Sequence, residues 1–248
     1  MIRLDNIKNN ALSALANDQE IKLGDRLCQE QFIQMGSLTL HLLSFTEFDE
    51  EVLESIDKNE RHCPLYGQVW PASLALCQYL LELNQNGTLA NSRAIELGCG
   101  LALPSLLAAK MGALVTATDN HPEVGGFVNL HRDLNNISAE KLQFFPLDFG
   151  QQHITVEKST DQLKNDWDFI FCSDILYEPA LYPDLIKQLI QLSGPQTQIV
   201  LSDPGRVGLG DFLSMIKDYG FMLRHQNCKL NDCQVLVFRK QQRASASW

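Results

Sequence analysis

The sequence predicts an α/β fold, in which one mostly parallel sheet carries helices on both faces. From residue 93 onward, apolar segments of strand length alternate with segments of helix length, as in parallel sheets joined by crossover helices. The strand-like segments, such as 199–201, are apolar throughout, which is typical of strands covered on both faces. The chain has 248 residues, 45% of them hydrophobic, so it can form a packed core. We expect an extension over residues 1–60, a main domain over 61–240 and a frayed tail over 241–248.

Four segments precede the alternating region. Residues 1–29 are polar with scattered leucines, and we expect a loose helix there. Two strand-like runs joined by a Gly-Ser turn predict a β-hairpin over residues 31–45. The acidic segment 47–59 predicts a second helix. Pro71 is well placed to open a third helix that runs to Leu83, because proline is favoured in the first helical turn.

The main domain is expected to contain seven strands and four further helices. Strands are expected over residues 93–97, 113–118, 141–147, 167–173, 197–202, 221–230 and 233–239. Helices are expected over residues 103–111, 122–135, 181–192 and 209–219. The last two strands leave no room for a helix between them, so they should pair antiparallel.

Composition limits the classes of partner. The net charge of −10 suits a cationic ligand or a basic protein surface, and it does not suit nucleic acid, whose phosphates require a surplus of Lys and Arg. The seven cysteines include no Cys-x-x-Cys pair, and the six histidines lack metal-ligand spacing. We therefore expect reduced thiols and no metal site. With no signal-peptide pattern and no bilayer-length apolar run, we expect a cytoplasmic protein without membrane insertion.

A glycine loop follows the first strand of the alternating region. Gly98-Cys99-Gly100 lies between that strand and a helix with Pro104 in its first turn, which is the arrangement of nucleotide-binding loops. The third glycine of the dinucleotide fingerprint is replaced by Leu103, and Pro104 removes an N–H group that a pyrophosphate would use. S-adenosylmethionine (SAM) carries no phosphate and tolerates both changes. The loop therefore favours SAM over a nicotinamide dinucleotide.

Three acids accompany this loop at the ends of consecutive strands, where open α/β sheets bind ligands. Glu96 could balance the cationic sulfonium and ammonium of SAM. Asp119, 21 residues after Gly98, could accept hydrogen bonds from the ribose hydroxyls, and Asp148 could accept the adenine N–H. Each could also be a turn or helix-cap residue, above all Asp148. The candidate cofactor-binding residues are Trp70, Glu96, Gly98, Cys99, Gly100, Asp119, Asn120, Asp148, Phe149 and Ser173.

The fourth strand ends in Ser173-Asp174-Ile-Leu-Tyr177. Methyltransferases that act on nucleic-acid bases usually place Asn/Asp-Pro-Pro-aromatic there, so this segment counts against base methylation. Asp174-x-x-Tyr177, together with the glycine loop and Val-Trp-Pro-Ala over residues 69–72, resembles the DxxY group of seven-β-strand protein-lysine methyltransferases. Ser-Asp-Pro-Gly-Arg over residues 202–206 is similar to the branch that methylates the β subunit of electron-transfer flavoprotein.

This resemblance implies a Rossmann-like seven-stranded methyltransferase sheet with its last strand antiparallel. It implies that Trp70 borders the SAM site. It also implies that Asp174 and Tyr177, the candidate catalytic residues, border a channel for the lysine of a protein substrate. Asp174 would orient the amine and Tyr177 would shape the channel, although Trp70 and Tyr177 could instead be packed aromatic residues.

Three other functions stay open on the sequence. A small-molecule N-methyltransferase has the same fold, and a deep closed pocket over Asp174 would favour it, whereas an open acidic groove would favour a protein substrate. A non-catalytic SAM-binding scaffold would have a filled acceptor channel. A nicotinamide-dependent oxidoreductase is disfavoured by Leu103 and Pro104.

Overall fold

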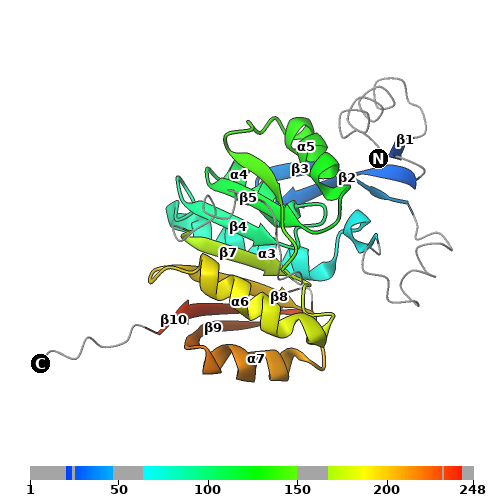
Figure 1. Ribbon diagram of the computed structural model, residues 1–248. Helices are drawn as coiled ribbons and strands as arrows, with labels where there is room; N and C mark the ends of the chain where they lie inside the picture. Colours follow the sequence, from blue (N-terminus) through cyan, green and yellow to red (C-terminus); the bar gives the residue numbers. More distant parts are fainter. Residues whose placement is uncertain (1–20, 24–25, 47–63, 150–166, 231, 242–248) are drawn as a thin grey trace, which may run out of the picture.

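The computed structural model describes residues 21–23, 26–46, 64–149, 167–230 and 232–241, which form two sheets and the helices that cover them (Figure 1). The smaller sheet has the order β1-β2-β3 and the larger sheet has the order β6-β5-β4-β7-β8-β10-β9. The small sheet consists of β1 (Ile21–Leu23), β2 (Arg26–Met35) and β3 (Leu38–Phe45). The large sheet consists of β4 (Arg93–Leu97), β5 (Leu114–Asp119), β6 (Leu142–Pro146), β7 (Phe169–Ser173), β8 (Gln198–Asp203), β9 (Phe221–Leu230) and β10 (Cys233–Lys240).

The N-terminal hairpin is confirmed, but the helix expected over residues 1–29 is wrong where the structure describes it. Residues 21–23 form β1, and β2 begins at Arg26. Ile21 and Leu23 are buried and Lys22 between them is exposed, which is the two-residue period of a strand. A run of three residues is too short to display this period clearly in the sequence. Residues 1–20, the acidic segment 47–59 and the tail beyond residue 241 lie outside the described residues.

The small sheet is fastened to the main domain by two side chains at the end of α5 (Val124–Leu134). Asn135 accepts a hydrogen bond from the His41 N–H at 3.0 Å and donates one to the His41 carbonyl at 2.7 Å. His131 is fully buried, and its Nε2 accepts the Leu43 N–H at 3.0 Å. Because these bonds satisfy the backbone of β3, the hairpin packs into the same core as the main domain. The division predicted near residue 60 stays a prediction.

The large sheet confirms the predicted topology. The pairs β6–β5, β5–β4, β4–β7 and β7–β8 are parallel, whereas β10 pairs antiparallel with both β8 and β9. The carboxyl ends of the parallel strands therefore meet at one edge of the sheet. That edge carries the glycine pair, Asp119 at the end of β5, Asp148 after β6, and the Asp174 segment.

Helices cover both faces of this sheet. The helices are α3 (Pro71–Leu83), α4 (Leu103–Lys110), α5, α6 (Tyr182–Leu192) and α7 (Leu209–Asp218), with short 3₁₀ turns that include η1 (Leu65–Gly67) and η4 (Pro179–Leu181). One core cluster joins α3, α4, α5 and the hairpin to one face, and a second joins α6 and α7 to the other. Figure 1 shows the same division. Within the described ranges, no helix combines the length and the apolarity that a membrane span requires.

Candidate functional site

A cavity of about 520 Å³ opens at the carboxyl edge of the large sheet. It is lined by every predicted site residue except Glu96. From the sequence prediction these are Trp70, Gly98, Cys99, Gly100, Asp119, Asn120, Asp148, Phe149, Ser173, Asp174 and Tyr177. The lining also includes residues that the sequence analysis did not single out for this site, among them Tyr66, Gln68, Val69, Ser73, Ile175, Glu178 and Arg206.

The glycine loop lines the cavity with backbone. Gly98 has φ +63°, a left-handed conformation that favours glycine, and a Cβ there would lie 2.8 Å from Cγ2 of Ile175. Gly100 is also left-handed. A Cβ added to it would lie 3.4 Å from the backbone oxygen of Tyr66. Both positions therefore need glycine, and a ligand can approach the loop backbone closely.

Asp119 is held in the cavity wall by backbone donors. Its Oδ2 accepts the Gly100 N–H at 3.0 Å and its Oδ1 accepts the His121 N–H at 2.9 Å. Burial raises the pKa of this carboxyl, and the hydrogen bonds from the backbone oppose that shift. Asp119 thus ties the glycine loop to the end of β5 and still presents an edge to the cavity.

Glu96 lies below the glycine loop and does not line the cavity. Strand alternation puts it on the face of β4 that α4 covers, where its Oε2 accepts the Ser105 N–H at 3.0 Å and the Ser105 hydroxyl. Its Oε1 is buried and has no partner among the described residues. Burial raises the pKa of Glu96 to about 8, although the Ser105 bonds act in the opposite direction. Its assignment to the cofactor stays a prediction.

The predicted residues after β5 and β6 are brought together. The Leu147 N–H donates to the Asp119 carbonyl at 2.9 Å, which holds the end of β6 beside the end of β5. Asp148 and Phe149 follow directly and are half-buried, while Asn120 is exposed. A carboxylate, an amide and an aromatic ring therefore border the same part of the cavity.

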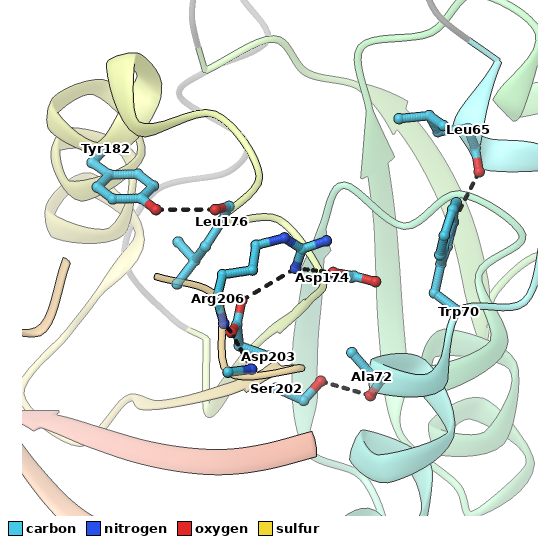
Figure 2. Close-up of polar contacts among 10 residues, drawn as sticks. Leu65, Trp70, Ala72, Asp174, Leu176, Tyr182, Ser202, Asp203 and Arg206 are labelled. Atoms are coloured by element: carbon cyan, nitrogen blue, oxygen red, sulfur yellow. Dashed lines mark hydrogen bonds and ion pairs between the residues drawn. The ribbon is translucent and has the colours of Figure 1, made fainter. Parts of the chain in front are cut away.

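Trp70 lines the cavity directly before α3, and two hydrogen bonds hold it in place. Its indole N–H donates to the Leu65 carbonyl at 2.9 Å, and its carbonyl accepts the Ser73 N–H at 3.0 Å, which opens α3 (Figure 2). In the first turn of α3, the Ala72 carbonyl accepts the Ser202 hydroxyl at 2.7 Å. Because Ser202 belongs to β8, this bond fastens the start of α3 to the sheet.

Asp174 follows β7 in a conformation that is rare for a residue with a side chain. Its φ is +60°, its N–H donates to the Ser202 carbonyl at 3.0 Å, and its carboxylate pairs with the guanidinium of Arg206. Tyr177 is 55% exposed at the mouth of the cavity. The tight turn between them is held by the Tyr182 hydroxyl, which donates to the Leu176 carbonyl at 3.0 Å (Figure 2). The positive φ of Asp174 marks this residue as a candidate functional position.

Arg206 is the main residue of this site that the sequence reasoning missed. It was noted within the Ser-Asp-Pro-Gly-Arg pattern, but its contact with Asp174 could not be foreseen from that pattern. Asp203 fixes the turn that carries Arg206. The Asp203 Oδ1 accepts the backbone N–H groups of Gly205 and Arg206 at 2.7 and 2.8 Å. Burial alone would lower the pKa of Arg206, but the bonds with Asp174 and Asp203 outweigh burial and raise it.

The residues of the cavity fit the chemistry of SAM. The described lining contains four carboxylates and a single Lys or Arg, which is Arg206; the carboxylates are Asp119, Asp148, Asp174 and Glu178. Such a lining suits a ligand with positive groups and disfavours a pyrophosphate. Left-handed Gly98 and Gly100 leave the space that a close ligand needs.

A family model described as lysine methyltransferase matches residues 47–218. The chain belongs to this lysine methyltransferase family. The match covers α3, the glycine loop, the acids after β5 and β6, Asp174 and Arg206, so it includes the whole cavity lining described above. The family membership predicted from the sequence is therefore confirmed.

Curated relatives carry related names. The chain is 34% identical over 151 residues to the protein N-lysine methyltransferase METTL21A of Xenopus tropicalis, covering 60% of this chain and 66% of that protein. It is 33% identical to the EEF1A lysine methyltransferase 3 of the same species, covering 56% and 57%. It is also 33% identical to the histone-arginine methyltransferase METTL23 of Xenopus laevis, covering 64% of each. The chain thus spans 57% to 66% of the length of these relatives.

Solved structures share the fold. Magnesium protoporphyrin IX methyltransferase of Synechocystis PCC 6803, with bound SAM, matches with a TM-score of 0.56 at 16% identity, covering 80% of this chain and 100% of that one. The 16S rRNA N2 G1207 methyltransferase of Thermus thermophilus matches with a TM-score of 0.60 at 14% identity, covering 89% and 52%. The predicted methyltransferase fold is confirmed. The branch that methylates the flavoprotein β subunit stays a prediction, because the relatives above bear other names.

Proposed function

We propose that this chain transfers a methyl group from SAM to the side-chain nitrogen of a lysine in another protein. The observation that carries this proposal is Asp174, a carboxylate set in a left-handed turn beside exposed Tyr177, at the mouth of an acidic cavity. Membership of a lysine methyltransferase family supports the same reading.

The cofactor end of the cavity would be formed by the glycine loop and the residues that face it. Gly98 and Gly100 admit the ligand, Asp119 accepts hydrogen bonds, and Asp148 and Phe149 border the part we assign to the adenine. When bound, SAM supplies a methyl group that its positive sulfur has already activated. Trp70, fixed by its bond to Leu65, lines the cavity and would help to exclude water from the bound cofactor.

The acceptor end would be formed by Asp174 and Tyr177. Asp174 orients the incoming amine, and much of the rate enhancement comes from holding it in line with the methyl group. A free lysine has a pKa of about 10.4 and must lose its proton before it reacts. Apolar lining residues such as Val69, Ile175 and Leu181 favour the neutral amine by limiting its hydration.

The partner would be a protein with an accessible lysine on a basic surface, because the chain carries a net charge of −10. We place the enzyme in the cytoplasm, since Cys28, Cys77, Cys99, Cys172 and Cys233 are buried free thiols. A small amine is the alternative acceptor, and the open, exposed position of Tyr177 argues for a larger one.

Calorimetric titration with SAM, with NAD as the control, tests the cofactor. We expect micromolar SAM binding and no NAD binding. Absence of SAM binding would contradict the proposal at its first step.

Labelling with tritiated-methyl SAM in a cell lysate tests the acceptor. Protein bands that take up label are hydrolysed, and we expect methyl-lysine. Label in methyl-arginine, or only in the low-molecular-mass fraction, would replace the lysine acceptor with arginine or a small molecule.

A further inference from the structure

The carboxylate of Asp174, which we assign to the acceptor end, is paired with a positively charged side chain. Among the lining residues that the structure describes, Arg206 is the only Lys or Arg, and its guanidinium pairs with Asp174. Figure 2 draws this carboxylate between the guanidinium and the Trp70 ring, and all three groups line the cavity. Arg206 therefore stands where the ammonium of an incoming lysine would be attracted.

Arg206 is built into this position and is not a loose surface arginine. Asp203 is fully buried, its Oδ1 accepts two backbone N–H groups of the turn that carries Arg206, and its Oδ2 lies 3.3 Å from the guanidinium. Gly205, in that turn, has φ +84°. Side-chain exposure is 30% for Arg206 and 9% for Asp174, so their pairing is only partly screened by water.

Without a paired cation, Asp174 would orient the lysine amine but would also hinder methyl transfer to it. A carboxylate close to an amine favours the charged ammonium, which has no lone pair to attack the methyl group. A second cation beside the amine has the opposite effect and favours the neutral form. An arginine keeps its own charge throughout the working pH range, so it can provide this effect without titrating.

We propose that Arg206 is a positioning residue that offsets the charge of Asp174, so that Asp174 accepts a hydrogen bond from the neutral lysine amine without holding the lysine as ammonium. This inference rests on the proposed function. In the free protein the ion pair between Arg206 and Asp174 keeps small ammonium ions from binding to the Asp174 carboxylate. When the substrate is bound, the positive charge of Arg206 lowers the pKa of the acceptor amine.

The first test measures the binding of n-butylammonium, a mimic of the lysine side chain, by NMR titration. The protein is saturated with S-adenosylhomocysteine so that the amine cannot enter the cofactor end. Arg206→Met removes the charge and keeps the aliphatic length, and Arg206→Lys is the matched control that keeps the charge. We expect Arg206→Met to bind the amine at least 10-fold more tightly than wild type, and Arg206→Lys to stay within about 3-fold.

The gain in n-butylammonium affinity should disappear in the double variant Arg206→Met/Asp174→Asn, because the carboxylate that attracts the amine is then absent. Equal or weaker binding of n-butylammonium by Arg206→Met, with unchanged thermal stability, would overturn the proposal. If Arg206→Met does not fold, Arg206→Gln replaces it with the same expected gain. This arm needs no protein acceptor, so it decides the role of Arg206 even if the lysate screen finds no methyl-lysine.

The second test follows kcat against pH with an acceptor protein identified in that screen. We expect Arg206→Met to raise the apparent pKa of kcat by about one unit, so that turnover falls about 10-fold at pH 7 and recovers at high pH. Arg206→Lys should keep the wild-type profile. A loss of kcat by the same factor at every pH would mean that Arg206 only supports the fold, and would overturn the proposal.

Discussion

The two ends of the cavity are built in different ways. At the cofactor end, Asp119 is only 9% exposed and both of its oxygens accept backbone N–H groups. At the acceptor end, Tyr177 is 55% exposed and Asp174 is paired with a side chain from another loop. The first end depends on backbone conformation and the second on charged side chains. Substitutions at the first should therefore change cofactor affinity, and substitutions at the second should change turnover.

The largest expected effect is at Gly98. Gly98→Ala places a Cβ 2.8 Å from Cγ2 of Ile175 at φ +63°, so the loop must shift. We expect SAM affinity to fall at least about 100-fold, which corresponds to about 3 kcal/mol. Calorimetry measures the affinity, and the melting temperature reports whether the chain still folds.

Gly87 provides the matched control. It has φ +70°, similar to Gly98, but an added Cβ meets nothing within 4 Å. Gly87→Ala should cost about 1 kcal/mol of stability and leave SAM affinity unchanged. Equal affinity losses in both variants would contradict a cofactor end set by local backbone contacts.

A smaller effect is expected at Glu96, beneath the same loop. The pKa of Glu96 is raised to about 8 in the folded chain, so between its unfolded value and pH 8 the unfolded chain releases a proton that the folded chain keeps. Wild-type stability therefore falls as pH rises through this window. Glu96→Gln lacks this loss and should be about 2 to 3 kcal/mol more stable than wild type at pH 7, with little difference near pH 4.

Urea unfolding at several pH values measures this difference. A stability difference that does not change with pH would contradict a protonated Glu96. Calorimetry on the same variant tests whether Glu96 serves the cofactor, since a loss of SAM affinity would support the sequence prediction that its charge balances the ligand.

The smallest effect is expected at Ser202, whose hydroxyl joins β8 to the start of α3. Ser202→Ala removes the 2.7 Å hydrogen bond to the Ala72 carbonyl, which fastens the start of α3 and hence Trp70. We expect a loss of about 1 kcal/mol in the free energy of unfolding. Ser193→Ala is the control, because the Ser193 hydroxyl is buried and has no partner among the described residues. If both variants lose the same stability, the Ser202 bond has no special role.

The sequence predicted most residues of the proposed cofactor end because each one follows or ends a segment that can be recognised locally. β4 and α3 were predicted with their observed bounds, since Gly98 ends the apolar strand and Pro71 is favoured in the first turn of a helix. The direction of the Glu96 side chain was not foreseen. Ala94, two residues earlier, lies in the core under α3 and α4, so the two-residue period of β4 was the available signal.

The acceptor end was predicted less completely because its central contact is not local. Asp174 and Tyr177 were predicted from their motif, but Arg206 is 32 residues beyond Asp174. It reaches the carboxylate only because β7 and β8 are adjacent and parallel, which brings both loops to the same edge. Topology of this kind follows from tertiary packing and not from any segment alone.

Transfer of tritiated methyl groups by wild type and Asp174→Asn, with SAM affinity measured for both, tests the central claim most directly. We expect wild type to label lysine in protein, and Asp174→Asn to lose at least about 100-fold of this activity while its SAM affinity stays within a few-fold. Equal labelling by the two proteins would contradict the role of Asp174 at the acceptor end. Loss of SAM binding in Asp174→Asn would instead move this residue to the cofactor end and contradict the division of the cavity into a cofactor end and an acceptor end.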